Sequence, residues 1–78
     1  MLSIPLSLKN AEQRIITELK RENLQVFFKI TNFDSNTGAI EYNLSSLDPL
    51  EEVPIEADRI VDRTFKVWRE TFLSHNNT

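Results

Sequence analysis

Two strand-like segments that flank a turn sequence constrain the fold of this chain most. Residues 24–31 and 39–44 are rich in β-branched and aromatic residues, which favour strands. Between them, residues 34–38 read Asp-Ser-Asn-Thr-Gly, and all of these residue types are typical of turns. The sequence therefore predicts an antiparallel hairpin with strands over about residues 24–33 and 39–45.

One register of this hairpin satisfies both of its faces. It joins three apolar pairs on one face, namely Ile30 with Ile40, Phe28 with Tyr42 and Val26 with Leu44. The same register sets Lys29 opposite Glu41 on the other face, where a pair of opposite charges stabilises a sheet. A slip by one residue would exchange the two faces, so we expect this register, with the three apolar pairs toward the core.

One amphipathic helix is predicted before the hairpin in the sequence and another after it. The first covers about residues 10–23, and its apolar residues share one face: Ala11, Ile15, Ile16 and Leu19. The second covers about residues 55–74 and has the longer apolar stripe, formed by Ala57, Val61, Phe65, Trp68 and Phe72. Before it, Asp48 and Pro49 predict one short helical turn, which Pro54 ends.

Residues 2–8 alternate apolar and polar types, which is the period of a half-buried strand. Pro5 donates no hydrogen bond to a ladder, so we expect a strand at a sheet edge or an extended arm. The predicted fold is α+β, a small two-layer sandwich in which two helices pack on the hairpin, with the order strand, helix, strand, strand, helix. A single domain spans residues 1–74, and residues 75–78 form a disordered polar tail.

The composition narrows the classes of protein further. The chain has 78 residues with no cysteine, one glycine and a formal net charge of −3. These values predict one small domain, exclude a disulfide framework and argue mildly against a non-specific nucleic-acid coat. No apolar run approaches the roughly 20 residues of a membrane helix, and no signal peptide is recognisable, so we expect a cytoplasmic protein with no membrane association.

No set of residues has the pattern of a catalytic, metal or cofactor site. The turn at residues 34–38 begins like a calcium loop, but Gly38, Ala39 and Ser45 stand where that pattern needs other residues. His75 is the only histidine, and it lies in the polar tail with no carboxylate or cysteine beside it. The sequence therefore predicts no enzyme, no cofactor and no bound metal.

Two groups of residues are candidates for binding a partner. Phe27 and Phe33 fall on the hairpin face opposite the predicted core, together with Lys29, and two aromatic residues there indicate a covered face or a binding patch. A second group, Arg59, Arg63 and Lys66, forms a basic stripe along the last helix. Acidic residues interleave with this stripe, so a salt-bridged solvated surface is its simpler interpretation and phosphate binding the less favoured one.

The sequence thus predicts a small non-enzymatic protein-interaction module: a regulator, an inhibitor or an accessory subunit that binds another protein. We also expect a homodimer, since a small sheet with aromatic residues on both faces leaves apolar surface and unpaired edges that a twofold partner would cover. The expected partner-binding residues are Phe27, Phe33, Lys29, Arg59, Arg63 and Lys66. The alternative is a nucleic-acid-binding regulator that uses the basic stripe or the outer sheet face. Nucleic acid is the less favoured partner because of the net negative charge.

Overall fold

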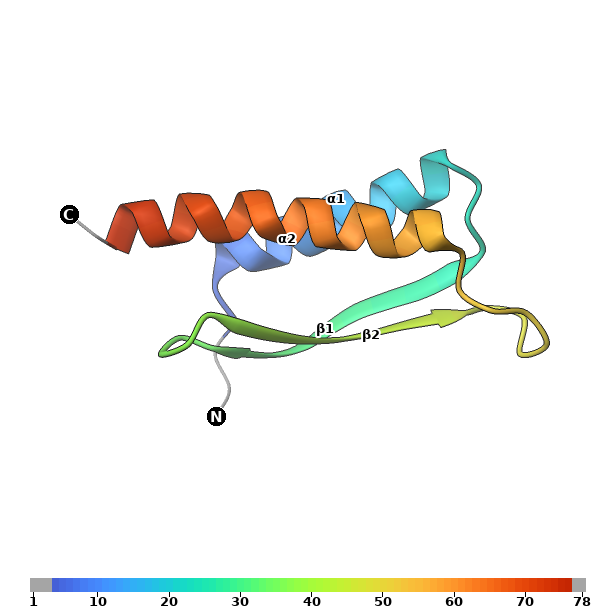
Figure 1. The fold of residues 1–78 in the computed structure, drawn as a ribbon, viewed down its shortest axis with the longest axis horizontal. Coiled ribbons are helices and arrows are strands. Elements are labelled where there is room, and N and C mark those ends of the chain that lie inside the picture. Colours follow the sequence, from blue (N-terminus) through green and yellow to red (C-terminus); the bar gives the residue numbers. More distant parts are fainter. Residues whose placement is uncertain (1–3, 77–78) are drawn as a thin grey trace.

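Two helices cover one face of a two-stranded sheet. The computed structural model describes residues 4–76 and the burial of side chains over residues 4–72. The elements are helix α1 (Leu6–Arg21), strand β1 (Val26–Asp34), strand β2 (Ala39–Ser46) and helix α2 (Ile55–Asn76). In Figure 1 both helices lie on the same side of the hairpin, with α2 and β2 in front of α1 and β1. The predicted two-layer α+β class is confirmed, with the order α-β-β-α.

The N-terminal strand predicted over residues 2–8 is wrong in its described part, because α1 already begins at Leu6. The buried stripe of α1 starts at Leu8, which is fully buried. The stripe continues at helical spacing through Ala11 and Ile15. The carbonyl of Pro5 accepts hydrogen bonds from the amides of residues 8 and 9, both at 3.0 Å. Burying Leu8 in this stripe outweighs the short alternating pattern, and residues 2 and 3 lie outside the described residues.

The hairpin register differs by two residues from the prediction. The observed partners are Ile30 with Tyr42, Phe28 with Leu44, and Lys29 with Asn43. A shift by two keeps every side chain on its face, so Phe28 and Ile30 are buried as predicted. The predicted pair of Lys29 and Glu41 is wrong, because Lys29 faces an asparagine instead.

A β-bulge separates this register from that of the hairpin end. The register changes between Ile30 and Asn32, so Thr31 is an extra residue on β1. Its hydroxyl donates a hydrogen bond to the carbonyl of Glu41 at 3.1 Å. Beyond the bulge, Phe33 faces Ile40. One extra residue reverses the alternation of a strand, so Phe33 turns toward the helices.

The turn itself is closed by Asp34 and Gly38. The Gly38 amide donates to the Asp34 carbonyl at 2.7 Å, and the Asp34 carboxylate accepts from the amide of Asn36 at 2.9 Å. Gly38 has a φ of 76°, which glycine adopts without strain. Asp34 is therefore paired with Ala39 at the end of the ladder, and the turn occupies residues 35–38. This places the turn later in the chain than the predicted register required.

The two helices occupy different places over the sheet. Phe65 of α2 contacts Phe28 of β1 and Tyr42 of β2, with ring centroids 6.0 and 5.4 Å apart, so α2 lies over both strands. The carboxylate of Glu12 on α1 accepts a hydrogen bond from the Ile30 amide at 2.7 Å. This bond places α1 at the edge of β1 that does not face β2.

The connection and the last helix follow the prediction closely. Asp48 caps one short turn, with its carboxylate accepting from the Leu50 amide at 2.9 Å and its carbonyl from the Glu51 amide at 3.0 Å. Helix α2 begins at Ile55, as predicted, and continues to Asn76. A disordered polar tail was expected from residue 75, but residues 75 and 76 are helical, so the prediction is wrong for these two residues. Residues 77 and 78 lie outside the described part of the chain.

Candidate functional site

The outer face of the sheet carries one of the two predicted aromatic residues. Phe27 is 47% exposed and lies opposite Ser45, on the face that the helices leave uncovered. Lys29 is exposed on the same face. Phe33 is only 7% exposed and contacts Trp68 in the core, so its predicted placement on the outer face of the sheet is wrong. The bulge, which the sequence pattern did not reveal, is the cause.

An apolar groove lies beside Phe27, between the C-terminal end of α1 and the start of β1. We call it the Phe27 groove. Its volume is about 230 Å³, and its lining residues are Ile16, Leu19, Lys20, Leu24, Val26, Phe27, Phe28 and Leu47. Leu47 is 61% exposed, and its amide donates a hydrogen bond to the Gln25 carbonyl at 2.9 Å, which extends the ladder beyond β2. The groove therefore has an exposed apolar side chain from each strand end.

Leu47 was not predicted as a candidate because it follows the second predicted strand. Its signal lies in the register: with the observed pairing, Leu47 comes opposite Gln25, two residues before Phe27. The predicted register placed residue 45 near the start of the first strand, so Leu47 fell beyond the hairpin. The observed register places Leu47 opposite Gln25, two residues nearer to Phe27 than the predicted register would.

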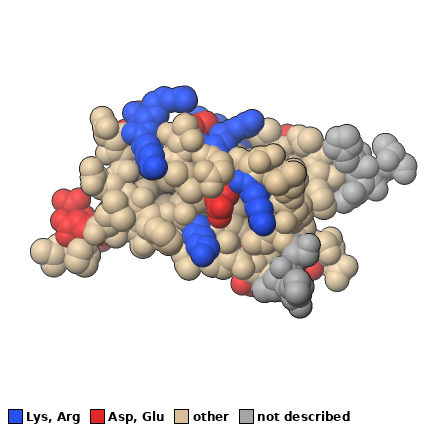
Figure 2. Space-filling model, turned by 180° about the vertical axis from the view of Figure 1, so that it is seen from behind, with Lys and Arg blue, Asp and Glu red and all other residues tan. Residues whose placement is uncertain are grey.

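Helix α1, which forms one wall of the groove, carries more basic than acidic residues. Helix α1 contains four basic residues, Lys9, Arg14, Lys20 and Arg21, against two acidic ones, Glu12 and Glu18. Lys20 lines the Phe27 groove itself. Figure 2 shows the back of the molecule relative to Figure 1, where several Lys and Arg side chains are spread over the surface and few acidic side chains lie between them.

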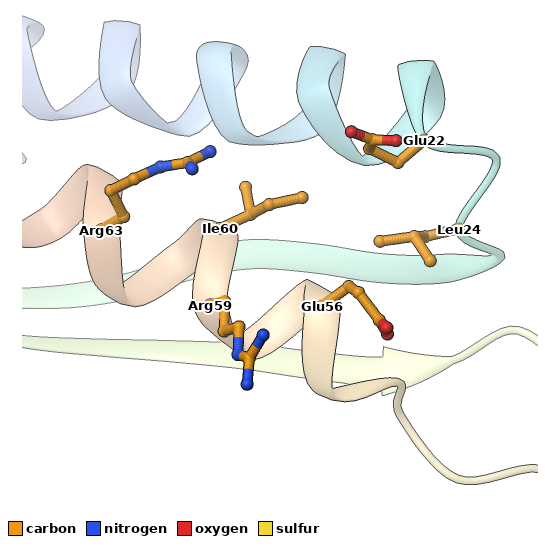
Figure 3. A pocket seen from close by; sticks show the side chains of 6 residues that line it. All are labelled: Glu22, Leu24, Glu56, Arg59, Ile60 and Arg63. Carbon is orange, nitrogen blue, oxygen red and sulfur yellow. The ribbon is translucent and has the colours of Figure 1, made fainter.

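A second hollow lies between the end of α1 and the first turns of α2. It has a volume of about 540 Å³, and its lining residues are Glu22, Leu24, Glu56, Arg59, Ile60 and Arg63. In Figure 3, Leu24 and Ile60 extend toward one another, while Arg63 extends toward α1. Two arginines thus share the hollow with two glutamates, and the charges compensate. We call it the charged cleft.

The three predicted basic residues of α2 do not form one basic surface. Arg59 and Arg63 line the charged cleft, whereas Lys66 is exposed and is not part of its lining. A nitrogen of the Arg63 guanidinium lies 3.0 Å from a carboxylate oxygen of Glu18 on α1. The two side chains are 68% and 28% exposed, so water screens this ion pair and its contribution is at most about 1 kcal/mol. Glu18 is 45 positions from Arg63 in the sequence, so the pattern of residues within α2 could not predict this ion pair.

The surroundings of Tyr42 change the pKa of its hydroxyl. Partial burial raises the pKa of the Tyr42 hydroxyl above its ordinary value of 10.0, and the carboxylates of Asp62 and Asp58 raise it further. The tyrosine is held neutral and packs against Phe28 and Phe65. The shift reflects the position of Tyr42 at the side of the core, next to the acidic residues of α2.

The described part of the chain offers no grouping of three metal-ligating side chains. Over the same residues, neither helix has an apolar stretch of the length that would cross a bilayer. Comparisons with protein-family models, with curated proteins and with solved structures find no match for this chain.

Proposed function

We propose that this chain is a small protein-binding module, a regulator, inhibitor or accessory subunit that acts by binding another protein through the Phe27 groove. The observation that carries the proposal is that Phe27 and Leu47, which are 47% and 61% exposed at the two strand ends, both line one apolar hollow. Exposed aromatic side chains next to a hollow contribute most of the binding energy in many protein interfaces. The proposed site of action is the cytoplasm.

The charges around the groove select the chemistry of the partner. Lys20 lines the groove, and Lys29 lies two residues along β1 from Phe27 on the same face. A partner segment with one apolar side chain for the groove and acidic residues on either side of it would complement both lysines. The partner is therefore a protein segment of this type, and the lysines contribute to the rate of association more than to affinity.

Nucleic acid fits these surfaces less well. Arg59 and Arg63 are the residues that would contact phosphates, yet Glu22 and Glu56 line the same cleft and Glu18 already pairs with Arg63. A phosphate backbone would meet carboxylates together with the arginines. Binding through this cleft would weaken steeply as salt rises, which separates it from an apolar contact.

A displayed library of random peptides tests the proposal. The purified wild-type chain is the bait, and peptides that also bind the Phe27→Ser chain are removed by negative selection. We expect enriched peptides that share one large apolar residue flanked by Asp or Glu. A synthesised consensus peptide should bind the wild-type chain at least about tenfold more tightly than Phe27→Ser, which corresponds to about 1.4 kcal/mol. Lys29→Glu should weaken binding by a smaller factor.

Val67→Ser is the matched control, since Val67 is 52% exposed but lies on α2, away from the groove. This variant should bind the peptide like the wild type. Absence of any enriched motif, or equal binding by Phe27→Ser, overturns the proposal. If Arg59→Ser removes binding to a single-stranded oligonucleotide while Phe27→Ser keeps it, the nucleic-acid alternative replaces it.

A further inference from the structure

Strand β2 has one edge that no other strand covers within residues 4–76. The Leu47 amide bonds to the Gln25 carbonyl, so every second residue from there, Ser45 and Asn43, directs its backbone groups toward β1. The amides and carbonyls of Tyr42 and Leu44 consequently point away from β1, toward the open edge. The corresponding edge of β1 is different, because Glu12 accepts from the amide of Ile30 there.

The open edge lacks the features that normally prevent strand pairing. Lysine, proline and bulges protect exposed edges, but β2 contains no lysine or proline, and the bulge lies on β1. Its apolar side chains on the helix face are incompletely covered: Ile40, Tyr42 and Leu44 are half-buried, whereas Phe28 and Ile30 of β1 are buried. A further strand with an apolar inner face would complete this side of the core.

We infer that the occupant is a second copy of this chain, whose β2 pairs antiparallel with the first across a twofold axis at Tyr42. The two hairpins then form one four-stranded sheet. Glu41 comes to lie opposite Asn43 of the second copy, and Ile40 opposite Leu44. This register keeps like charges apart, whereas an axis at Glu41 would place two carboxylates opposite each other.

The position of α2 allows this pairing. Since α2 lies over both β1 and β2, the two α2 helices of such a dimer would be about two strand spacings apart, or about 10 Å, which is a normal distance for packed helices. The twofold axis makes the helices antiparallel. Tyr42 contacts Phe65, with ring centroids 5.4 Å apart, so an axis through Tyr42 passes near the level of Phe65.

Charge complementarity supports a second copy as the occupant. On α2, Arg63 reaches Glu18 of α1, whereas Phe65 contacts Tyr42 of β2. The carboxylate of Asp62 also acts on the Tyr42 hydroxyl, so we place Asp62 on the side of α2 next to the open edge. Arg69 follows seven residues later and so lies on nearly the same helix face. With antiparallel helices crossing near Phe65, Asp62 of each copy comes beside Arg69 of the other. One twofold contact thus forms two ion pairs between the helices.

A charge exchange tests the dimer and its geometry together. Sedimentation equilibrium from low micromolar to millimolar concentration should show a monomer–dimer equilibrium. Asp62→Arg should weaken dimerisation by about tenfold or more, because two attractive pairs become repulsive, and Arg69→Asp should do the same. The double exchange, Asp62→Arg with Arg69→Asp, should restore the wild-type dissociation constant. Glu70→Arg reverses a charge elsewhere on α2 and should leave dimerisation unchanged.

Amide hydrogen exchange tests the dimer in the wild-type chain, without any substitution. Exchange of the Tyr42 and Leu44 amides should slow as protein concentration rises, whereas the Asn43 amide, which bonds within the hairpin, should be protected at every concentration. A chain that stays monomeric at millimolar concentration, a double exchange that fails to restore the dimer, or concentration-independent exchange at Tyr42 and Leu44 overturns the inference. Phe27→Ser should dimerise normally, so failure of the groove proposal and failure of the dimer are separate results.

Discussion

At the scale of single residues, Phe27 and Phe33 show how one extra residue decides a role. They lie six positions apart on one strand, so regular alternation would put both side chains on the same face. The bulge at Thr31 reverses the alternation between them, and Phe33 stacks edge-on against Trp68 and Phe72, with ring centroids 5.4 and 5.6 Å apart. One phenylalanine is available to a partner and the other is part of the core.

Serine substitutions at these two positions should therefore have very different effects. Phe33→Ser removes a buried aromatic ring and should cost at least about 3 kcal/mol of the free energy of unfolding. Phe27→Ser should cost about 1 kcal/mol or less, since nearly half of that side chain already contacts solvent. Urea denaturation followed by circular dichroism measures both, and equal losses would contradict the observed bulge.

Tyr42 provides a second prediction at this scale, because it is the only tyrosine in the chain. Ultraviolet absorbance of tyrosinate should give a pKa above 10.0 in the folded protein, mainly because burial disfavours the charged form and secondarily because of Asp62 and Asp58. Asp62→Asn should lower that pKa toward the ordinary value. A titration at or below 10.0 in the folded wild type would refute the burial of the hydroxyl.

The sign of the associated stability change follows from the direction of this shift. The folded-state pKa of Tyr42 lies above the unfolded one, so folding favours the neutral hydroxyl. The contribution is fully present below pH about 10 and is lost as the pH rises through the raised pKa. Tyr42→Phe should therefore reduce the alkaline loss of stability, measured as urea midpoints across this range.

At the scale of elements, α1 occupies the edge of β1 where a third strand could pair, and one of its side chains bonds to that edge. The Glu12 carboxylate accepts from the Ile30 amide at 2.7 Å on the edge of β1. Because Leu8, Ala11, Ile15 and Leu19 are all buried, the helix also covers the core on that side. A sheet of only two strands is marginal by itself, so this contact and the helix packing together stabilise the hairpin.

Glu12→Ala should cost about 1–2 kcal/mol, since it leaves a partly buried amide without its acceptor. Glu12→Gln keeps an acceptor oxygen and should cost less. Amide exchange at Ile30 should accelerate in Glu12→Ala relative to the wild type. Gln13→Ala, at an exposed neighbouring position, serves as the control, and an alanine variant at residue 12 as stable as this control would show that the bond contributes nothing.

At the scale of the whole molecule, α2 is the element that joins both strands and α1 into one core. Its buried residues include Ala57, Val61, Phe65 and Trp68, while Thr64 is a buried polar one. Phe65 is central, since its ring lies within 6.0 Å of the rings of both Phe28 and Tyr42. A domain this small has little stability to lose, so the packing of this helix governs folding.

Phe65→Ala should cost about 3–5 kcal/mol, a large part of the total stability of a small domain. Thermal melting followed by circular dichroism and by the fluorescence of Trp68, the only tryptophan, should show a much lower midpoint or no folded state. Val67→Ala, at a position 52% exposed on the same helix, should melt close to the wild type. Similar midpoints for the two variants would place Phe65 at the surface.

The sequence by itself determined the features that depend on local periodicity and turn chemistry. The long helix from Ile55, the hairpin around residues 34–38 and the burial of Phe28 and Ile30 follow from apolar spacing and from residue types that favour turns. Each of these properties is encoded within a few neighbouring residues. A prediction from neighbouring residues therefore identified the α+β class and the inner face of the sheet.

Only the tertiary structure decided the register, the bulge, the start of α1 and the partner of Arg63. Each depends on contacts between distant segments: Phe33 turns inward to meet Trp68 and Phe72, and the guanidinium of Arg63 reaches Glu18 on another helix. Shifting the hairpin by two residues preserves both of its faces, so alternation alone leaves several registers nearly equal. Packing against α2 selects one of these registers. The bulge in that register turns Phe33 into the core, so the candidate site consists of Phe27 and Leu47 and not of Phe27 and Phe33.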